Sequence, residues 1–67
     1  MLANRLKQWR TAKGLSVKEL SVLSGVSVDT IKRIEKARVI HQINGDIMTR
    51  LSAAMGLHAN AVFPTKE

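Results

Sequence analysis

Cysteine is absent from this 67-residue sequence, and aromatic residues make up only 3% of it. Without cysteine, neither a disulfide framework nor a cysteine-based zinc site can stabilise so short a chain. Apolar runs of 18 or more residues are also missing, which excludes a membrane-spanning helix. The first residues are basic and amphipathic, and they lack the continuous apolar core of a signal peptide. We therefore expect a cytoplasmic protein.

Apolar residues make up 45% of the chain, and nearly all of them are aliphatic, which suits an all-helical core. A domain of this size buries only about 60% of the surface that its unfolded chain exposes, so it gains stability from dimerisation. The spacing of apolar residues predicts one compact five-helix domain over residues 1–67, without repeats or linkers. The expected helices are 2–13, 17–24, 28–36, one between Asn44 and Gly56, and 59–63.

Residues 16–35 carry the most informative local pattern. Ser16 is a helix cap, and Glu19 completes a Ser-x-x-Glu capping box; Ser27 repeats the cap for a second helix. Gly25 between them suits the left-handed residue that ends a helix and allows the chain to turn. Two short helices joined in this way form a helix-turn-helix signature, which indicates double-stranded DNA as the partner. The apolar residues expected to point inward are Leu20, Leu23, Ile31 and Ile34.

The net charge of +6 is concentrated on the same part of the chain. Residues 1–38 hold nine Lys or Arg against three acids, whereas residues 39–67 hold two of each. Scattered cations usually form nothing more than a solvated surface. Their accumulation around a helix-turn-helix favours a polyanionic partner.

The segments on either side leave more room for alternatives. Leu2, Leu6 and Trp9 recur at helical spacing, so Trp9 is expected in the core, not stacked on a base. This basic amphipathic helix also suits a membrane surface, but its apolar stripe is narrow. Further on, Asn44-Gly45 is compatible with a hairpin turn, and we prefer Asn44 as the cap of the fourth helix.

Short motifs that run through nearly the whole chain are Leu6–Arg10, Gly14–Ser16, Glu19-Leu20, Leu23–Ser27, Thr30-Ile31, Arg33–Glu35, Leu51–Gly56 and Val62-Phe63. In this order and spacing they resemble the Cro/repressor (Xre-type) helix-turn-helix family of bacterial and phage transcription regulators. The resemblance implies a lambda-repressor-like, all-α DNA-binding domain that binds as a dimer, with helix 28–36 in the major groove.

The resemblance also implies roles for individual residues. Positions that match the family's base readers are Ser27, Val28, Asp29, Lys32 and Arg33. Positions expected to contact the DNA backbone are Ser16, Val17, Lys18, Thr30, Lys36 and Arg38. Arg10 and Glu35 are expected to pair and to tie the first helix to the end of the third.

Four positions depart from the family pattern. Val17 stands where a phosphate-contacting Gln is common, so only backbone N–H groups donate there. Val28 offers a thymine methyl contact and no hydrogen bond. Asp29 either accepts from a cytosine amino group or pairs with the basic residues of its own helix, Lys32 and Arg33, and we favour the pairing. Ala37 replaces a common Gly, so the helix is expected to run on or to end differently.

These observations predict a homodimeric repressor that binds an inverted-repeat operator and uses no cofactor, metal or small-molecule ligand. Residues 40–63 are expected to hold the dimer surface, with Ile40, Ile43, Leu57, Ala61 and Val62 as its contacts.

Other classes of function fit less well. The alternative is a protein-interaction module, such as an antitoxin or an accessory subunit, supported by the apolar 39–43 segment and by exposed Val17, Val22 and Val28. RNA binding lacks exposed aromatic platforms. Catalysis is not expected, because His41, on a loop, and His58, at a helix start, are far apart in sequence and have no accompanying ligands.

Overall fold

The computed structural model describes residues 2–40 and 43–65, and these form five helices and a small sheet. The elements in chain order are β1 (Leu2–Ala3), α1 (Leu6–Ala12), α2 (Val17–Ser24), α3 (Val28–Lys36), β2 (Val39–Ile40), α4 (Gly45–Ala54) and α5 (Ala59–Val62). β1 pairs antiparallel with β2, with Leu2 opposite Ile40. The predicted five-helix domain is confirmed, but the sheet shows that it is not purely α-helical.

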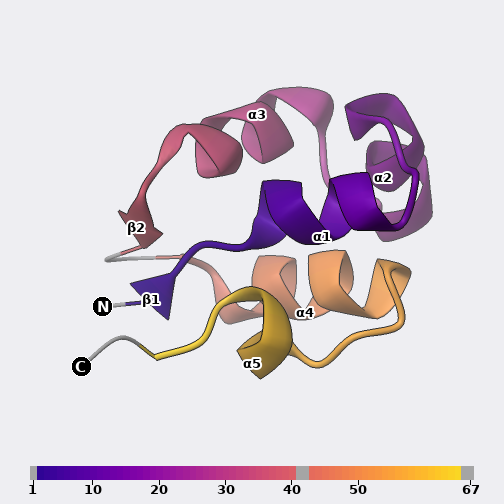
Figure 1. The fold of residues 1–67 in the computed structure, drawn as a ribbon. Helices are drawn as coiled ribbons and strands as arrows, with labels where there is room; N and C mark the ends of the chain where they lie inside the picture. The colour runs from indigo at the N-terminus through magenta and orange to yellow at the C-terminus, as the bar shows by residue number, and fades with distance from the viewer. Residues whose placement is uncertain (1, 41–42, 66–67) are drawn as a thin grey trace.

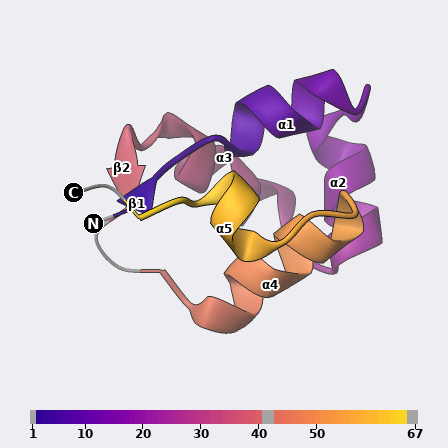
Figure 2. The same ribbon diagram turned by 60° about the horizontal axis from the view of Figure 1, so that its bottom comes forward.

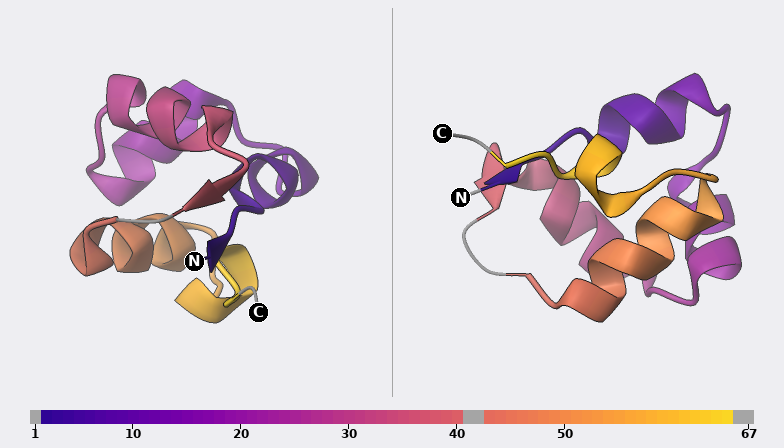
Figure 3. Two further views of the ribbon diagram at one scale, coloured as in Figure 1. Left: turned by 90° about the vertical axis from the view of Figure 1, so that its left-hand side faces the viewer. Right: turned by 90° about the horizontal axis from the view of Figure 1, so that it is seen from below.

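The helices pack so that α3 lies along one edge of the molecule (Figure 1). α3 contacts α1 and α2, whereas α4 contacts α2 and α5. The strands lie at the end of the molecule away from α2, as Figure 2 and the right-hand view of Figure 3 also show. The described helices include none that is long and apolar enough to cross a membrane.

One apolar cluster receives a side chain from every helix. Its members are Leu6, Leu20, Val26, Ile31, Ile40, Leu51, Met55, Val62 and Phe63. Each fully buried aliphatic or aromatic side chain contributes about 1.5–3 kcal/mol relative to an exposed one. Trp9 is half-buried against this cluster, and its Nε1 donates a hydrogen bond to the Ala61 carbonyl at 2.9 Å. The core role predicted for Trp9 is confirmed.

The start of the first helix was predicted wrongly. Residues 2 and 3 are extended, and α1 begins at Leu6. The Asn4 Oδ1 atom accepts a hydrogen bond from the Leu6 N–H at 3.1 Å, a turn that Asn side chains favour. The Ala3 N–H donates to the Pro64 carbonyl at 2.8 Å. Pairing with distant segments therefore overrides the helical spacing of Leu2 and Leu6.

The inward face of α2 also differs from the prediction. Leu20 is fully buried, but Leu23 is 59% exposed, and Ser24 takes the buried position one turn after Leu20. The Ser24 hydroxyl donates to the Leu20 carbonyl at 2.6 Å and accepts from the Val26 N–H at 3.2 Å. Because its hydroxyl has hydrogen-bond partners, the small serine can be buried at this position.

The fourth helix begins and ends where the predicted capping residues, Asn44 and Gly56, place it. Asn44 accepts a hydrogen bond from the Asp46 N–H at 2.8 Å and caps α4, so the alternative hairpin turn is not formed. Gly56 has a φ of +71° just beyond the end of α4. The last helix ends at Val62, one residue before its predicted end.

Candidate nucleic-acid interface

The helix-turn-helix has the local geometry that its caps predict. The Ser16 Oγ atom accepts from the Glu19 N–H at 3.0 Å, and the Glu19 carboxylate accepts from the Ser16 N–H at 3.0 Å. Gly25 has a φ of +74° at the turn, where its N–H donates to the Ser21 carbonyl. Ser27 accepts from the Thr30 N–H at 3.2 Å. The predicted capping box, the second cap and the left-handed glycine are all confirmed.

α3 presents one continuous exposed stripe to solvent. Ile31 is buried and Ile34 is half-buried against the core, which turns the opposite side of the helix outward. The exposed residues recur at i, i+3, i+4 and i+7, and we call them the α3 outer face: Asp29, Lys32, Arg33 and Lys36. This face carries three cations and one acid. Arg38 is exposed just beyond its C-terminal end.

Two other predicted base readers, Ser27 and Val28, lie at the start of α3 together with Thr30, a predicted DNA backbone contact. Ser27 is exposed, whereas Val28 and Thr30 are half-buried. The Ser27 and Thr30 hydroxyls lie 2.7 Å apart and hydrogen-bond to each other. Each hydroxyl therefore has a fixed position beside the α3 outer face.

Asp29 does not form the ion pair that we favoured. Among the described residues, the ion pairs are Arg10–Glu35 and Asp46–Arg50. Asp46 and Arg50 show that an i, i+4 pair can close, at 2.8 Å. The exposed Asp29 carboxylate has neither Lys32 nor Arg33 within ion-pair distance, so it stays accessible for a base contact.

The N-terminal end of α2 offers backbone donors beside a lysine. The capping box uses the N–H groups of Ser16 and Glu19 and does not use those of Val17 and Lys18. Val17 is half-buried against the core, while Lys18 is exposed. Hydrogen bonds from the Ser16 backbone and hydroxyl lower the pKa of Glu19. A helix N-terminus with free N–H groups and a nearby cation is suited to a phosphate.

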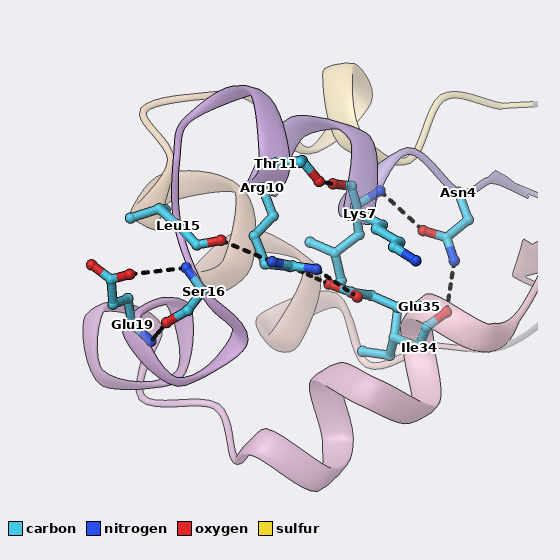
Figure 4. A network of polar contacts seen from close by, with 10 residues as sticks. Asn4, Lys7, Arg10, Thr11, Leu15, Ser16, Glu19, Ile34 and Glu35 are labelled. Atoms are coloured by element: carbon cyan, nitrogen blue, oxygen red, sulfur yellow. Dashed lines mark hydrogen bonds and ion pairs between the residues drawn. The ribbon is translucent and has the colours of Figure 1, made fainter.

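An ion pair joins α1 to the last turn of α3 (Figure 4). Arg10 Nε lies 2.7 Å from one Glu35 oxygen, and Arg10 Nη2 lies 3.2 Å from the other. Arg10 Nη1 also donates to the Leu15 carbonyl at 2.8 Å, just before α2. The side chains are only 13% and 10% exposed, and the hydrogen bonds that Arg10 donates to the Glu35 carboxylate raise the pKa of Arg10. Arg10 thus holds both helices of the motif against α1.

Asn4 makes a second connection to α3, which the sequence reasoning missed. Its Nδ2 atom donates to the Ile34 carbonyl at 2.6 Å and to the Ala37 carbonyl at 2.7 Å. α3 ends at Lys36, and Ala37 is extended, with φ −80° and ψ 131°. The missing glycine at position 37 was the available signal, because a helix without a left-handed end needs other donors for its last carbonyls.

Two of the five predicted dimer contacts are wrong. Ile40 is 6% exposed and Val62 is fully buried, and both belong to the core of the monomer. The core of so small a domain also requires apolar residues from loops and short helices, so these two are not available for a dimer surface. Ile43, Leu57 and Ala61 are half-buried and keep part of their surface.

Within the described part of the chain, the exposed large apolar side chains belong to α2. Val22 is 77% exposed and Leu23 is 59% exposed, whereas Val17 and Val28 are half-buried and were wrongly expected to be exposed. An open hollow of about 330 Å³ is lined by Lys18, Glu19, Val22 and Leu23.

The described residues show no metal centre. Within residues 2–40 and 43–65, no three His, Cys, Asp or Glu side chains are grouped to hold a metal ion. His58 is exposed at the start of α5, and its side chain makes no capping hydrogen bond. His41 lies outside the described residues.

Comparison with known proteins assigns the same motif. A family model described as helix-turn-helix matches residues 6–61, which includes all five helices apart from the end of α5. No curated protein and no solved structure matched the chain.

Proposed function

Because the chain belongs to the Cro/C1-type helix-turn-helix family of DNA-binding regulators, we propose that it is a homodimeric repressor that binds an inverted-repeat operator. The observation that carries the proposal is the α3 outer face. It joins three cations and one acid in a single exposed stripe on the second helix of the motif. Such a stripe fits the major groove, which admits an α-helix and displays a distinct pattern of donors and acceptors for each base pair.

Base readout is assigned to Asp29, Lys32 and Arg33 of this stripe and to two residues beside it, Ser27 and Val28. Arg33 is the candidate for a bidentate contact to guanine, which is worth about 1–3 kcal/mol of discrimination. Asp29, which has no ion-pair partner among the described residues, is a candidate acceptor for a cytosine amino group. Lys32, Ser27 and Val28 complete the set proposed to face the bases.

Phosphate binding is assigned to both ends of the motif. Lys36 and Arg38 are exposed at the C-terminal end of α3, and Lys18 is exposed beside the unused N–H groups at the start of α2. Ser16 and Thr30 are proposed to add hydroxyl contacts. Such contacts position the protein without reading sequence, and they make affinity depend on salt.

The dimer belongs to the proposal because one recognition helix reads only a short half-site. A two-fold axis would place two α3 helices about 34 Å apart, which corresponds to half-sites about 10 bp apart. Of the apolar residues expected at the dimer surface, Ile43, Leu57 and Ala61 remain candidates. Monomeric protein on the operator at micromolar concentration would contradict this part.

The test compares one proposed base reader with one proposed phosphate anchor. Arg33→Ala is expected to reduce the preference for the operator over unrelated DNA. Lys36→Ala is expected to weaken binding to all sequences alike and to lower the salt slope by about one. Fluorescence anisotropy over a salt series measures both quantities. Lys13→Ala, which removes an exposed lysine that follows α1, is the control and should change neither.

Identical behaviour of the Arg33 and Lys36 variants would overturn the division between base reader and phosphate anchor. Absence of any sequence preference in the unaltered protein would overturn DNA-specific regulation itself.

A protein-interaction module is the second candidate function, and exposed Val22 and Leu23 favour it. In that case the helix-turn-helix would serve as scaffold for a partner that covers α2. A V22S/L23S double variant would then lose its partner, while Arg33→Ala would keep it. Under the DNA-binding proposal, Arg33→Ala weakens binding to the operator, whereas V22S/L23S retains it.

A further inference from the structure

The end of α3 is held by a side chain that lies at least 30 positions earlier in the chain. The Asn4 amide donates to the Ile34 and Ala37 carbonyls, at 2.6 and 2.7 Å, across separations of 30 and 33 residues. Its oxygen accepts from the Leu6 N–H at 3.1 Å. Figure 4 shows Asn4 between the start of α1 and the last turn of α3. One side chain therefore begins α1 and closes α3.

α3 needs this support because its C-terminal end has no capping glycine. The last carbonyls of a helix lack partners within the helix, and a left-handed residue usually allows the following backbone to satisfy them. Ala37 is extended instead, and its N–H reaches only the Ile34 carbonyl, at 3.1 Å. Without Asn4, the Ala37 carbonyl would lose its donor and the last turn of α3 would be free to fray.

The two bonded carbonyls flank Lys36 and adjoin Arg38, two of the residues proposed to bind phosphate. Lys36 lies between Ile34 and Ala37, and the Ala37 carbonyl belongs to the peptide that leads into Arg38. Both cations are exposed, so no packing of their own fixes their direction. Asn4 therefore holds the backbone from which both of them project.

We propose that Asn4 is a positioning residue for DNA binding, which acts by fixing Lys36 and Arg38 at the end of the recognition helix. This inference rests on the proposed function. It assigns Asn4 no contact with DNA: its amide is already engaged by two carbonyls, and its effect passes through the two cations. Removing Asn4 should therefore matter only while those cations are present.

The experiment measures operator affinity for Asn4→Ala and Asn4→Ser, in the unaltered chain and in a K36A/R38A background. A serine hydroxyl can still accept from the Leu6 N–H, so Asn4→Ser preserves the start of α1 but cannot reach the two carbonyls. We expect each variant to raise Kd about tenfold in the unaltered chain, equivalent to ~1.4 kcal/mol. In the K36A/R38A background the same changes should raise Kd less than about twofold, because coupled residues are non-additive.

Trp9→Phe is the matched control. It removes one hydrogen bond from a side-chain N–H to a distant carbonyl, Trp9 to Ala61, and so loosens α1 from α5 without touching α3. All measurements are made well below the unfolding temperature of each variant. Trp9→Phe should lower that temperature and leave Kd unchanged.

Two results would overturn the inference. One is unchanged operator affinity in folded Asn4→Ser. The other is an equal penalty in both backgrounds, which would indicate a structural role without connection to the cations. If the unaltered chain prefers no DNA sequence, both the proposed function and this inference fail. If it prefers an operator but the Asn4 variants bind that operator equally well, only this inference fails.

Discussion

Replacing Glu35 with alanine is the most severe test of how the motif is held in place. The change leaves the Arg10 guanidinium, which is 13% exposed, with the Leu15 carbonyl as its remaining acceptor among the described residues. Breaking a buried pair by removing one partner costs about 3–5 kcal/mol, and this slight exposure suggests the lower end, about 3 kcal/mol. A domain of this size has a total stability of about 3–10 kcal/mol. Glu35→Ala should therefore lower Tm by about 12–24 °C.

The assay is urea and thermal unfolding, followed by the fluorescence of Trp9, the single tryptophan of the chain. The informative comparison is with the double variant R10M/E35L, which removes both charges and supplies apolar side chains. Such replacements are often neutral, so the double variant should lie within about 1 kcal/mol of the unaltered chain and be clearly more stable than Glu35→Ala. A cost below about 1 kcal/mol for Glu35→Ala, or a double variant less stable than the single one, would refute the reasoning.

Two further predictions concern the caps of the motif. Gly25→Ala should cost about 1–2 kcal/mol, because residue 25 has φ +74°; thermal unfolding measures it, and Gly45→Ala, where φ is not positive and an added Cβ meets nothing within 4 Å, should cost nothing. The pKa of Glu19 is lower in the folded state, because Ser16 donates to the charged carboxylate, so its contribution is present above the unfolded pKa, about 4.3, and is lost as the pH falls through the lower folded value. The Tm advantage of the unaltered chain over Glu19→Gln should therefore shrink below about pH 4.3, and a pH-independent difference would contradict this assignment.

The parts of the fold that sequence could predict are local. Ser16, Ser27 and Asn44 bond to N–H groups two or three residues ahead, and Gly25 needs no partner to adopt its conformation. These interactions are complete within one turn of chain, so that residue type and spacing suffice to predict them. Both ends of α2 and the start of α3 follow from them directly.

The errors occur where distant segments meet. Leu2 belongs to a helical pattern, yet it lies opposite Ile40 in a sheet and bridges to Thr65. Ile40 and Val62 have the composition of an interface, and only the packing of the whole chain places them in the core. Asn4 is an ordinary polar residue until residues 34 and 37 come within its reach.

The candidate site divides in the same way. Helical periodicity determines the α3 outer face, because the inward positions predicted for Ile31 and Ile34 fix which side of the helix is exposed. The interactions of each side chain are harder to predict from sequence. The ion pair predicted between Asp29 and its neighbours in α3 is not formed. The side chain that holds the far end of α3 comes from before α1, which no local pattern reveals.

Selection of bound duplexes from a random pool, followed by native mass measurement on the enriched sequence, tests the central claim most directly. If the α3 outer face reads the major groove of an operator, the pool should converge on an inverted repeat with half-site centres about 10 bp apart. Two chains should then be bound to each duplex. Sequence-specific binding by the α3 outer face would be contradicted if no sequence is enriched and salt abolishes binding equally for all members of the pool.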